Sequence, residues 1–102
     1  MAKFVYKMQN ILNIKTRLET QAKTEFSQAS ARLDEEEDKL RSLILRRRTY
    51  EDELKNASND KLDINKLKQY NNYIAVIKEL MEKQALQVRV AQKNLDKARE
   101  KL

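Results

Sequence analysis

The chain of 102 residues contains no glycine and no proline. Both residues interrupt the interior of an α-helix, glycine through its conformational freedom and proline through its ring and its missing N–H. A chain that lacks both can therefore be helical over almost its whole length. Charged residues make up 37% of the chain and aromatic residues 6%, which is typical of long amphipathic helices and coiled coils.

Cysteine and histidine are also absent. Their absence excludes disulfides, thiolate metal sites and the commonest catalytic bases, and the lack of cysteine fits a reducing compartment. There is no glycine-rich phosphate loop, and we expect neither an enzyme nor a cofactor. No apolar run approaches the ~18 residues that a membrane-spanning helix needs, and we find no signal peptide.

Apolar residues instead recur at spacings of three and four, in two separate runs. These spacings bring side chains to one face of a helix and favour left-handed pairing with another helix. The first run consists of Leu18, Ala22, Phe26, Ala29, Leu33, Glu36, Leu40, Leu43, Arg47, Tyr50 and Leu54. The second consists of Leu67, Tyr70, Ile74, Ile77, Met81, Gln84, Val88, Ala91, Leu95, Ala98 and Leu102.

The two runs predict an all-α fold in which two long helices form an antiparallel coiled-coil hairpin. Residues 58–60 are the most turn-like stretch, because Asn and Asp tolerate turn geometry. We expect a single hairpin over residues 1–102, with helices at about 3–57 and 61–102 and a turn at 58–60. Folding outward from the turn, Leu43 faces Ile77 and Leu18 faces Leu102. A parallel dimer of one continuous helix is the alternative.

Two of the three polar residues in the runs are predicted to meet. In the hairpin register Gln84 faces Glu36, whereas Arg47 faces the apolar Ile74. The aliphatic part of Arg47 can still cover its neighbours while its guanidinium reaches water. The register therefore predicts one polar contact inside an otherwise apolar interface.

The first 17 residues have no predicted partner in the second helix. They hold four basic residues and no acidic one, whereas the remainder holds 18 basic and 16 acidic residues. They also carry an apolar stripe of Phe4, Met8, Ile11 and Leu12, and exposed stripes mark contact surfaces. We weigh three occupants: a continuation of the natural chain beyond residue 102, a partner protein, or an anionic membrane surface. Self-association through the stripe also stays open.

Two sequence motifs resemble the FliJ family of bacterial flagellar export proteins. The first is an aromatic-x-aromatic opening followed by spaced Gln, Leu, Ile-Lys and Glu-x-x-Ala-Lys. Its residues here are Phe4, Tyr6, Gln9, Leu12, Ile14, Lys15, Glu19, Ala22 and Lys23. The second is Gln69-Tyr70-Asn71-Asn72-Tyr73-Ile74, which is similar to the family's Gln-Tyr-x-x-aromatic-Ile stretch. Family members are longer, so the resemblance also implies a chain that continues past residue 102.

The resemblance implies a non-enzymatic component of the flagellar type III export apparatus, shaped like the central stalk of rotary ATPases. Its implied partners are the hexameric export ATPase, the cytoplasmic domain of the export gate protein and export chaperones. The implied location is the cytoplasm at the flagellar base, with the inner membrane reached only through those partners. A stalk protein of a virulence type III secretion system is the nearest alternative.

The resemblance and the residue pattern together give two candidate docking sites. For the export ATPase the candidates are Phe4, Tyr6, Lys7, Met8, Gln9, Ile11 and Leu12. For the export gate they are Tyr73, Ile77, Leu80 and Gln84. Ordinary widening of the apolar helix face is the alternative explanation of the second set. A basic coiled-coil protein that binds nucleic acid is a further alternative, but beyond residue 17 the basic groups alternate with acidic ones, which argues against a phosphate-binding face.

Overall fold

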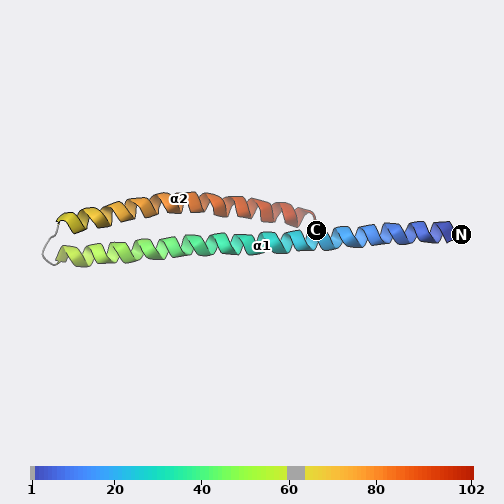
Figure 1. Ribbon diagram of the computed structural model, residues 1–102, viewed down its shortest axis with the longest axis horizontal. Helices are drawn as coiled ribbons and strands as arrows, with labels where there is room; N and C mark the ends of the chain where they lie inside the picture. The colour runs from blue at the N-terminus through green and yellow to red at the C-terminus, as the bar shows by residue number, and fades with distance from the viewer. Residues whose placement is uncertain (1, 60–63) are drawn as a thin grey trace.

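A computed structural model describes residues 2–59 and 64–102 of the chain. It contains two helices, α1 (Ala2–Asn59) and α2 (Ile64–Glu100), which lie side by side in opposite directions (Figure 1). The molecule is a rod of 92 × 16 × 15 Å. The antiparallel hairpin predicted from the two apolar runs is confirmed, and the parallel dimer of one continuous helix is not the fold of this chain.

The helix ends differ slightly from those expected. The backbone of α1 remains helical through Asn59, so the positions of Ser58 and Asn59 belong to the helix and not to a turn. Asp60, the third residue of the expected turn, lies outside the described residues. α2 ends at Glu100, and the N–H of Leu102 donates a 3.1 Å hydrogen bond to the carbonyl of Arg99. Lys97 and Arg99 in the last turn complement the negative end of the helix dipole.

The core is a thin line of contacts between the helices. Leu33 of α1 packs with Ala91 and Leu95 of α2, and Phe26, Ala29 and Val88 pack against this cluster. Ile77 and Ala98 are also buried. All of these residues belong to the two predicted runs, because spacings of three and four place them on the facing sides of the helices. Two helices have room for little more, and none of the large side chains that the structure describes is completely enclosed.

The outermost predicted pair is not buried. Leu18 is 60% exposed and Leu102 is 64% exposed, because α2 ends two residues before Leu102. Near this end an ion pair of 3.4 Å joins Lys101 and Glu25, and Leu18 and Lys101 line the same shallow hollow. Leu18 and Leu102 therefore do not belong to the buried core, and the partly buried stretch of α1 begins at Ala22.

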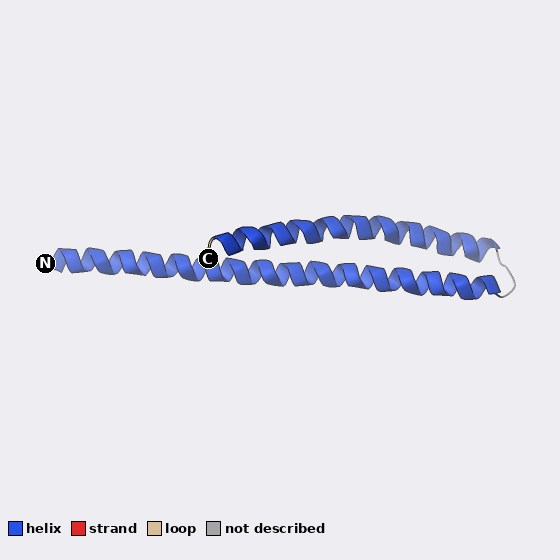
Figure 2. Cartoon of the chain, turned by 180° about the vertical axis from the view of Figure 1, so that it is seen from behind, coloured by secondary structure: helices blue, strands red, loops and turns tan. Residues whose placement is uncertain are grey.

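Residues 2–18 form an N-terminal extension that continues as a single helix beyond α2 (Figure 2). Every residue in this extension is exposed. Within the described residues, neither helix holds an apolar stretch of the kind needed to cross a membrane. The rod thus has two parts, a paired hairpin and an unpaired helical end.

Candidate docking surfaces

The N-terminal extension presents a broad apolar surface with no covering element among the described residues. At 100° per residue, Phe4, Met8, Ile11, Leu12 and Leu18 fall on one half of the helix. Each of these side chains is about half exposed or more. In a helical hairpin such a face is usually buried against the partner helix, but α2 does not run alongside residues 2–18. The predicted stripe is therefore present and open.

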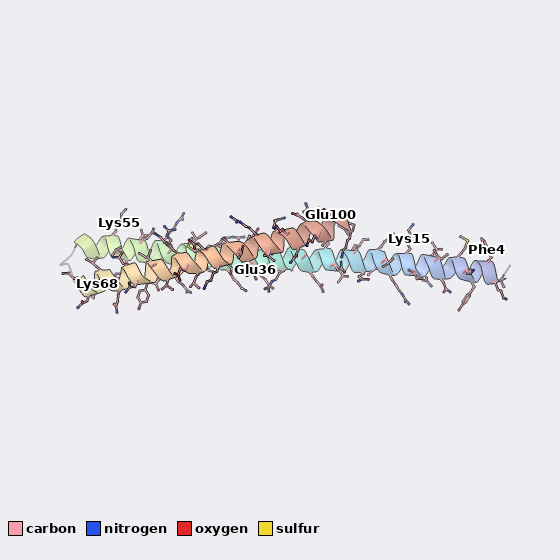
Figure 3. The ribbon with its side chains drawn as sticks, turned by 90° about the horizontal axis from the view of Figure 1, so that it is seen from above. Phe4, Lys15, Glu36, Lys55, Lys68 and Glu100 are labelled. Atoms are coloured by element: carbon pink, nitrogen blue, oxygen red, sulfur yellow. The ribbon has the colours of Figure 1, made fainter. Side chains whose placement is uncertain are left out.

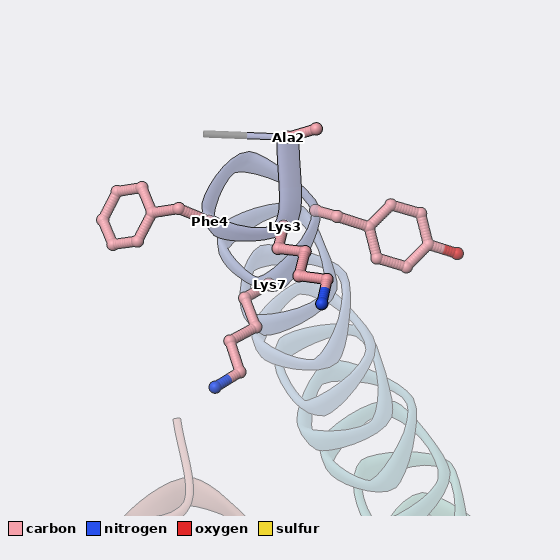
Figure 4. A pocket seen from close by; sticks show the side chains of 5 residues that line it. Ala2, Lys3, Phe4 and Lys7 are labelled. Atoms are coloured by element: carbon pink, nitrogen blue, oxygen red, sulfur yellow. The ribbon is translucent and has the colours of Figure 1, made fainter.

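Basic groups accompany this apolar surface. Lys15 projects from the extension, and Phe4 lies near its far end (Figure 3). Lys3 and Lys7 lie one turn apart, and together with Ala2, Phe4 and Tyr6 they line a shallow open hollow at the tip (Figure 4). Because no acidic residue occurs before Glu19, the positive charge of the tip is not compensated within the extension.

The seven residues predicted to dock with an ATPase do not all share one face. Tyr6 follows Phe4 by two positions, which places its ring on the opposite side of the helix. Gln9 also lies off the apolar stripe. Phe4, Met8, Ile11 and Leu12 therefore form one surface, whereas Tyr6 and Gln9 belong to the other side of the same helical segment.

The four residues predicted to dock with an export gate divide between the interface and the surface. Ile77 is only 5% exposed and belongs to the buried contact line. Gln84 is half-buried and uses its side-chain amide within the hairpin. Tyr73 and Leu80 are 49% and 41% exposed, respectively. Only these last two side chains present substantial surface to a partner.

Tyr73 is held by a ring contact that the sequence did not reveal. Its ring stacks on that of Tyr50 in α1, with centroids 5.6 Å apart and planes inclined by 22°. Elsewhere along the hairpin a cation–π contact joins Arg99 and Phe26, with the guanidinium carbon 6.0 Å from the ring centroid. Tyr73 therefore has one face against Tyr50 and the rest open.

Further exposed apolar side chains on α2 were missed as candidates. Leu86 and Val90 are both exposed, as is Val76 beside Leu80. They lie away from the α1 interface, so the apolar surface of α2 is wider than the predicted set. Their signal in the sequence was weak, because none of the three belongs to the two runs with spacings of three and four.

A shallow groove lies along the hairpin between the two helices. Its lining residues are Leu40, Ile44, Arg47, Lys78, Met81, Glu82 and Ala85. Arg47 lies at this groove with its Nε 2.9 Å from a carboxylate oxygen of Glu51, so its guanidinium is at the edge of the interface as predicted. The groove is open to solvent and does not enclose a ligand site.

The predicted contact of Gln84 with Glu36 is confirmed. The side-chain Nε2 of Gln84 donates a 2.9 Å hydrogen bond to the backbone carbonyl of Glu36 and another to its carboxylate. Arg32 and Lys39 lie 3.0 Å and 3.5 Å from the same carboxylate. The hydrogen bond from Gln84 lowers the pKa of Glu36; burial opposes this shift, and the two nearby cations add to it. Glu36 is thus a buried carboxylate that remains charged at neutral pH.

Among the residues that the structure describes, no group of three or more His, Cys, Asp or Glu side chains is arranged to hold a metal ion. The acidic run at residues 35–38 is engaged in ion pairs along α1, with Arg32, Lys39 and Arg41. The surfaces of this molecule therefore suit contacts with macromolecules better than the binding of a small ligand.

A long antiparallel hairpin with an exposed basic and apolar end defines a coiled-coil rod. A family model described as flagellar FliJ protein matches residues 4–102, which is essentially the whole chain. The chain therefore belongs to the FliJ family and is a component of the flagellar export apparatus. Members of this family are non-catalytic. No curated protein and no solved structure gives a significant match.

Proposed function

We propose that this chain acts as a stalk that docks in the hexameric flagellar export ATPase through its N-terminal extension. The observation that carries the proposal is the exposed stripe of Phe4, Met8, Ile11 and Leu12 on an unpaired helix. Large apolar side chains supply most of the binding energy at interfaces, and uncompensated positive charge accelerates encounter with an acidic partner. The proposed location is the cytoplasm at the flagellar base.

A second surface is proposed to contact the cytoplasmic domain of the export gate protein. Tyr73 and Leu80 are its anchors, because both side chains are substantially exposed. Ile77 and Gln84 are buried or half-buried and would act by holding α2 in place beneath them. Binding of export chaperones is proposed as a third activity of the rod. None of these roles requires a catalytic residue.

The ATPase proposal is tested by a pull-down with purified export ATPase. A triple variant Phe4→Ala, Met8→Ala, Ile11→Ala truncates three of the four side chains of the stripe, and we expect it to lose about 90% or more of the bound ATPase. The matched control Asn10→Ala, Asn13→Ala, Thr16→Ala changes three exposed residues of the same helix outside the stripe. The control should bind like the parent chain. Unchanged binding by the stripe variant would overturn the proposal.

The gate proposal needs a separate experiment, because the two surfaces lie on different helices. The variant Tyr73→Ala, Leu80→Ala should weaken binding to the isolated cytoplasmic domain of the gate protein while helicity is retained. Leu86→Ala, Val90→Ala is the matched control, since it removes two exposed apolar side chains from the same helix. Equal weakening by both variants would show that the apolar surface of α2 acts without the specificity proposed here.

A further inference from the structure

Glu36 is the only buried charged or polar residue among those that the structure describes, with 3% of its surface exposed. It lies on the face of α1 that packs against α2, at the middle of the hairpin (Figure 3). Its partner Gln84 lies at the corresponding position of α2 and contacts both its carbonyl and its carboxylate. No buried side-chain nitrogen or oxygen is left without a hydrogen-bond partner in the described part of the chain.

The neighbouring contact positions offer much less discrimination between registers. They hold Leu, Ile, Met, Val and Ala, which can replace one another at an apolar contact with modest changes in packing. If α2 slides along α1 by one heptad, most apolar residues meet other apolar residues. Apart from the Tyr50–Tyr73 stack, apolar packing therefore separates the native alignment only weakly from alignments shifted by seven residues.

The polar pair behaves differently when the helices slide. A shift of seven residues places Glu36 opposite either Ala91 or Ile77, and it places Gln84 opposite either Leu43 or Ala29. In both cases a carboxylate and an amide at the interface lose their mutual hydrogen bonds. Leaving a polar group unsatisfied at a buried position is far more costly than exchanging one aliphatic side chain for another.

We propose that Glu36 and Gln84 lock the axial register of the hairpin. The consequence reaches both ends of the molecule. A slip by one heptad would move α2 by about 10 Å along α1, because a helix rises about 1.5 Å per residue. That movement would change both the length of the uncovered N-terminal extension and its distance from Tyr73 and Leu80. The lock thus sets the spacing of the two exposed surfaces, whichever partners they bind.

The absence of natural cysteine makes the register directly measurable. Three cysteine pairs, each made by two Ala→Cys changes, report three alignments by their rates of disulfide formation. Positions 29 and 91, which pack in the same cluster, report the native register. Positions 29 and 98 report a shift of seven residues in one direction, and positions 22 and 91 report the opposite shift. All three pairs start from alanine, so side-chain size changes equally.

Each pair is measured in the parent chain and in the variant Glu36→Leu, Gln84→Leu. In the parent we expect the 29/91 pair to form at least about tenfold faster than either shifted pair. In the leucine variant the disulfide of at least one shifted pair should form at a rate within about threefold of that of the 29/91 pair, since leucine packs against any apolar neighbour. Leucine favours helix, so circular dichroism should show that the hairpin persists.

Two further variants distinguish the effect of the Glu36–Gln84 contact from general effects of substitution. Glu35→Leu, Gln87→Leu makes the same change of composition at two exposed positions and should preserve the native preference. The exchange Glu36→Gln, Gln84→Glu keeps a carboxylate facing an amide and should also preserve it. Retention of the roughly tenfold preference in the leucine variant would overturn the proposal. The proposal would also be overturned if the Glu36→Gln, Gln84→Glu variant stayed helical but lost the preference for the 29/91 disulfide.

Discussion

The rings of Tyr50 and Tyr73 stack across the hairpin with their centroids 5.6 Å apart. Tyr50 belongs to the contact line of α1, whereas Tyr73 lies at the edge of α2 and is 49% exposed. The stack therefore ties a surface residue to the interface. Tyr73 is one of the residues proposed to contact an export gate. The stack with Tyr50 restrains the orientation of its ring even when no partner is bound.

The Tyr50–Tyr73 stack predicts a measurable coupling between two positions 23 residues apart in the sequence. Tyr50→Leu and Tyr73→Leu should each destabilise the hairpin. The double variant should be less destabilised than their sum by about 0.5–1 kcal/mol, the usual value of an aromatic pair. Urea unfolding of the four chains measures this coupling. Strict additivity would mean that the two rings do not interact in solution.

Substitution of Leu95 tests whether the buried cluster supplies most of the stability of the hairpin. It is 7% exposed and packs with Leu33 and Ala91 in the buried cluster. Leu95→Ala should lower the free energy of unfolding by about 2–3 kcal/mol, toward the lower end for buried leucine because a two-helix rod can partly close the gap. Leu86→Ala, at an exposed position of the same helix, should cost less than about 0.5 kcal/mol. Equal losses would contradict the assigned core.

Glu36 predicts an acid-dependent loss of stability. Its pKa in the folded chain is lowered, chiefly by the hydrogen bond from Gln84. The folded state therefore binds this proton less readily than the unfolded state. The resulting stabilisation is present above the ordinary glutamate pKa of about 4.3 and is lost as the pH falls through the folded value.

Urea unfolding at a series of pH values from about 6 to about 2.5 measures this dependence. The parent chain should lose stability on acidification more steeply than Glu36→Gln, which has no carboxylate to titrate at this position. A Glu36→Gln chain with the same pH dependence as the parent would show that the hydrogen-bonded carboxylate does not contribute.

The N-terminal extension should contribute little to the stability of the hairpin. Because residues 2–18 are exposed throughout, deletion of residues 1–17 should change the free energy of unfolding by less than about 1 kcal/mol. Amide hydrogen exchange should be faster in the extension than around Leu33, since an isolated helix without tertiary contacts is marginal in water. Slow exchange throughout the extension would indicate that another element, such as a second copy of the chain, covers it.

Much of the fold could be predicted from spacing alone. A period of three and four residues marks one face of a helix regardless of context, and the absence of glycine and proline leaves that helix uninterrupted. The pairing of Glu36 with Gln84 could be predicted for the same reason, because both interrupt apolar runs at matching distances from the turn. The exposure of Leu18 and Leu102 could not be foreseen, since helix ends depend on local backbone hydrogen bonds that a regular repeat ignores.

The candidate surfaces were less predictable than the fold. The N-terminal stripe was visible in the sequence because no second run remains to cover it. The division between Ile77, which is buried, and Leu80, which is 41% exposed, depends on how far each helix face rotates toward its partner. They are three positions apart in the sequence, and a periodic pattern alone assigns both to one broad apolar face.

By itself the sequence determined two long helices, their antiparallel order, the polar contact within the interface and the concentration of positive charge at one end. These properties follow from residue spacing and composition, which act locally or through simple pairing. Only the tertiary structure decided that Tyr50 lies beneath Tyr73 and that Arg47 borders a groove with Lys78 and Met81. Such contacts depend on side-chain conformations at the edges of the helix interface, where residues of similar sequence spacing meet different neighbours.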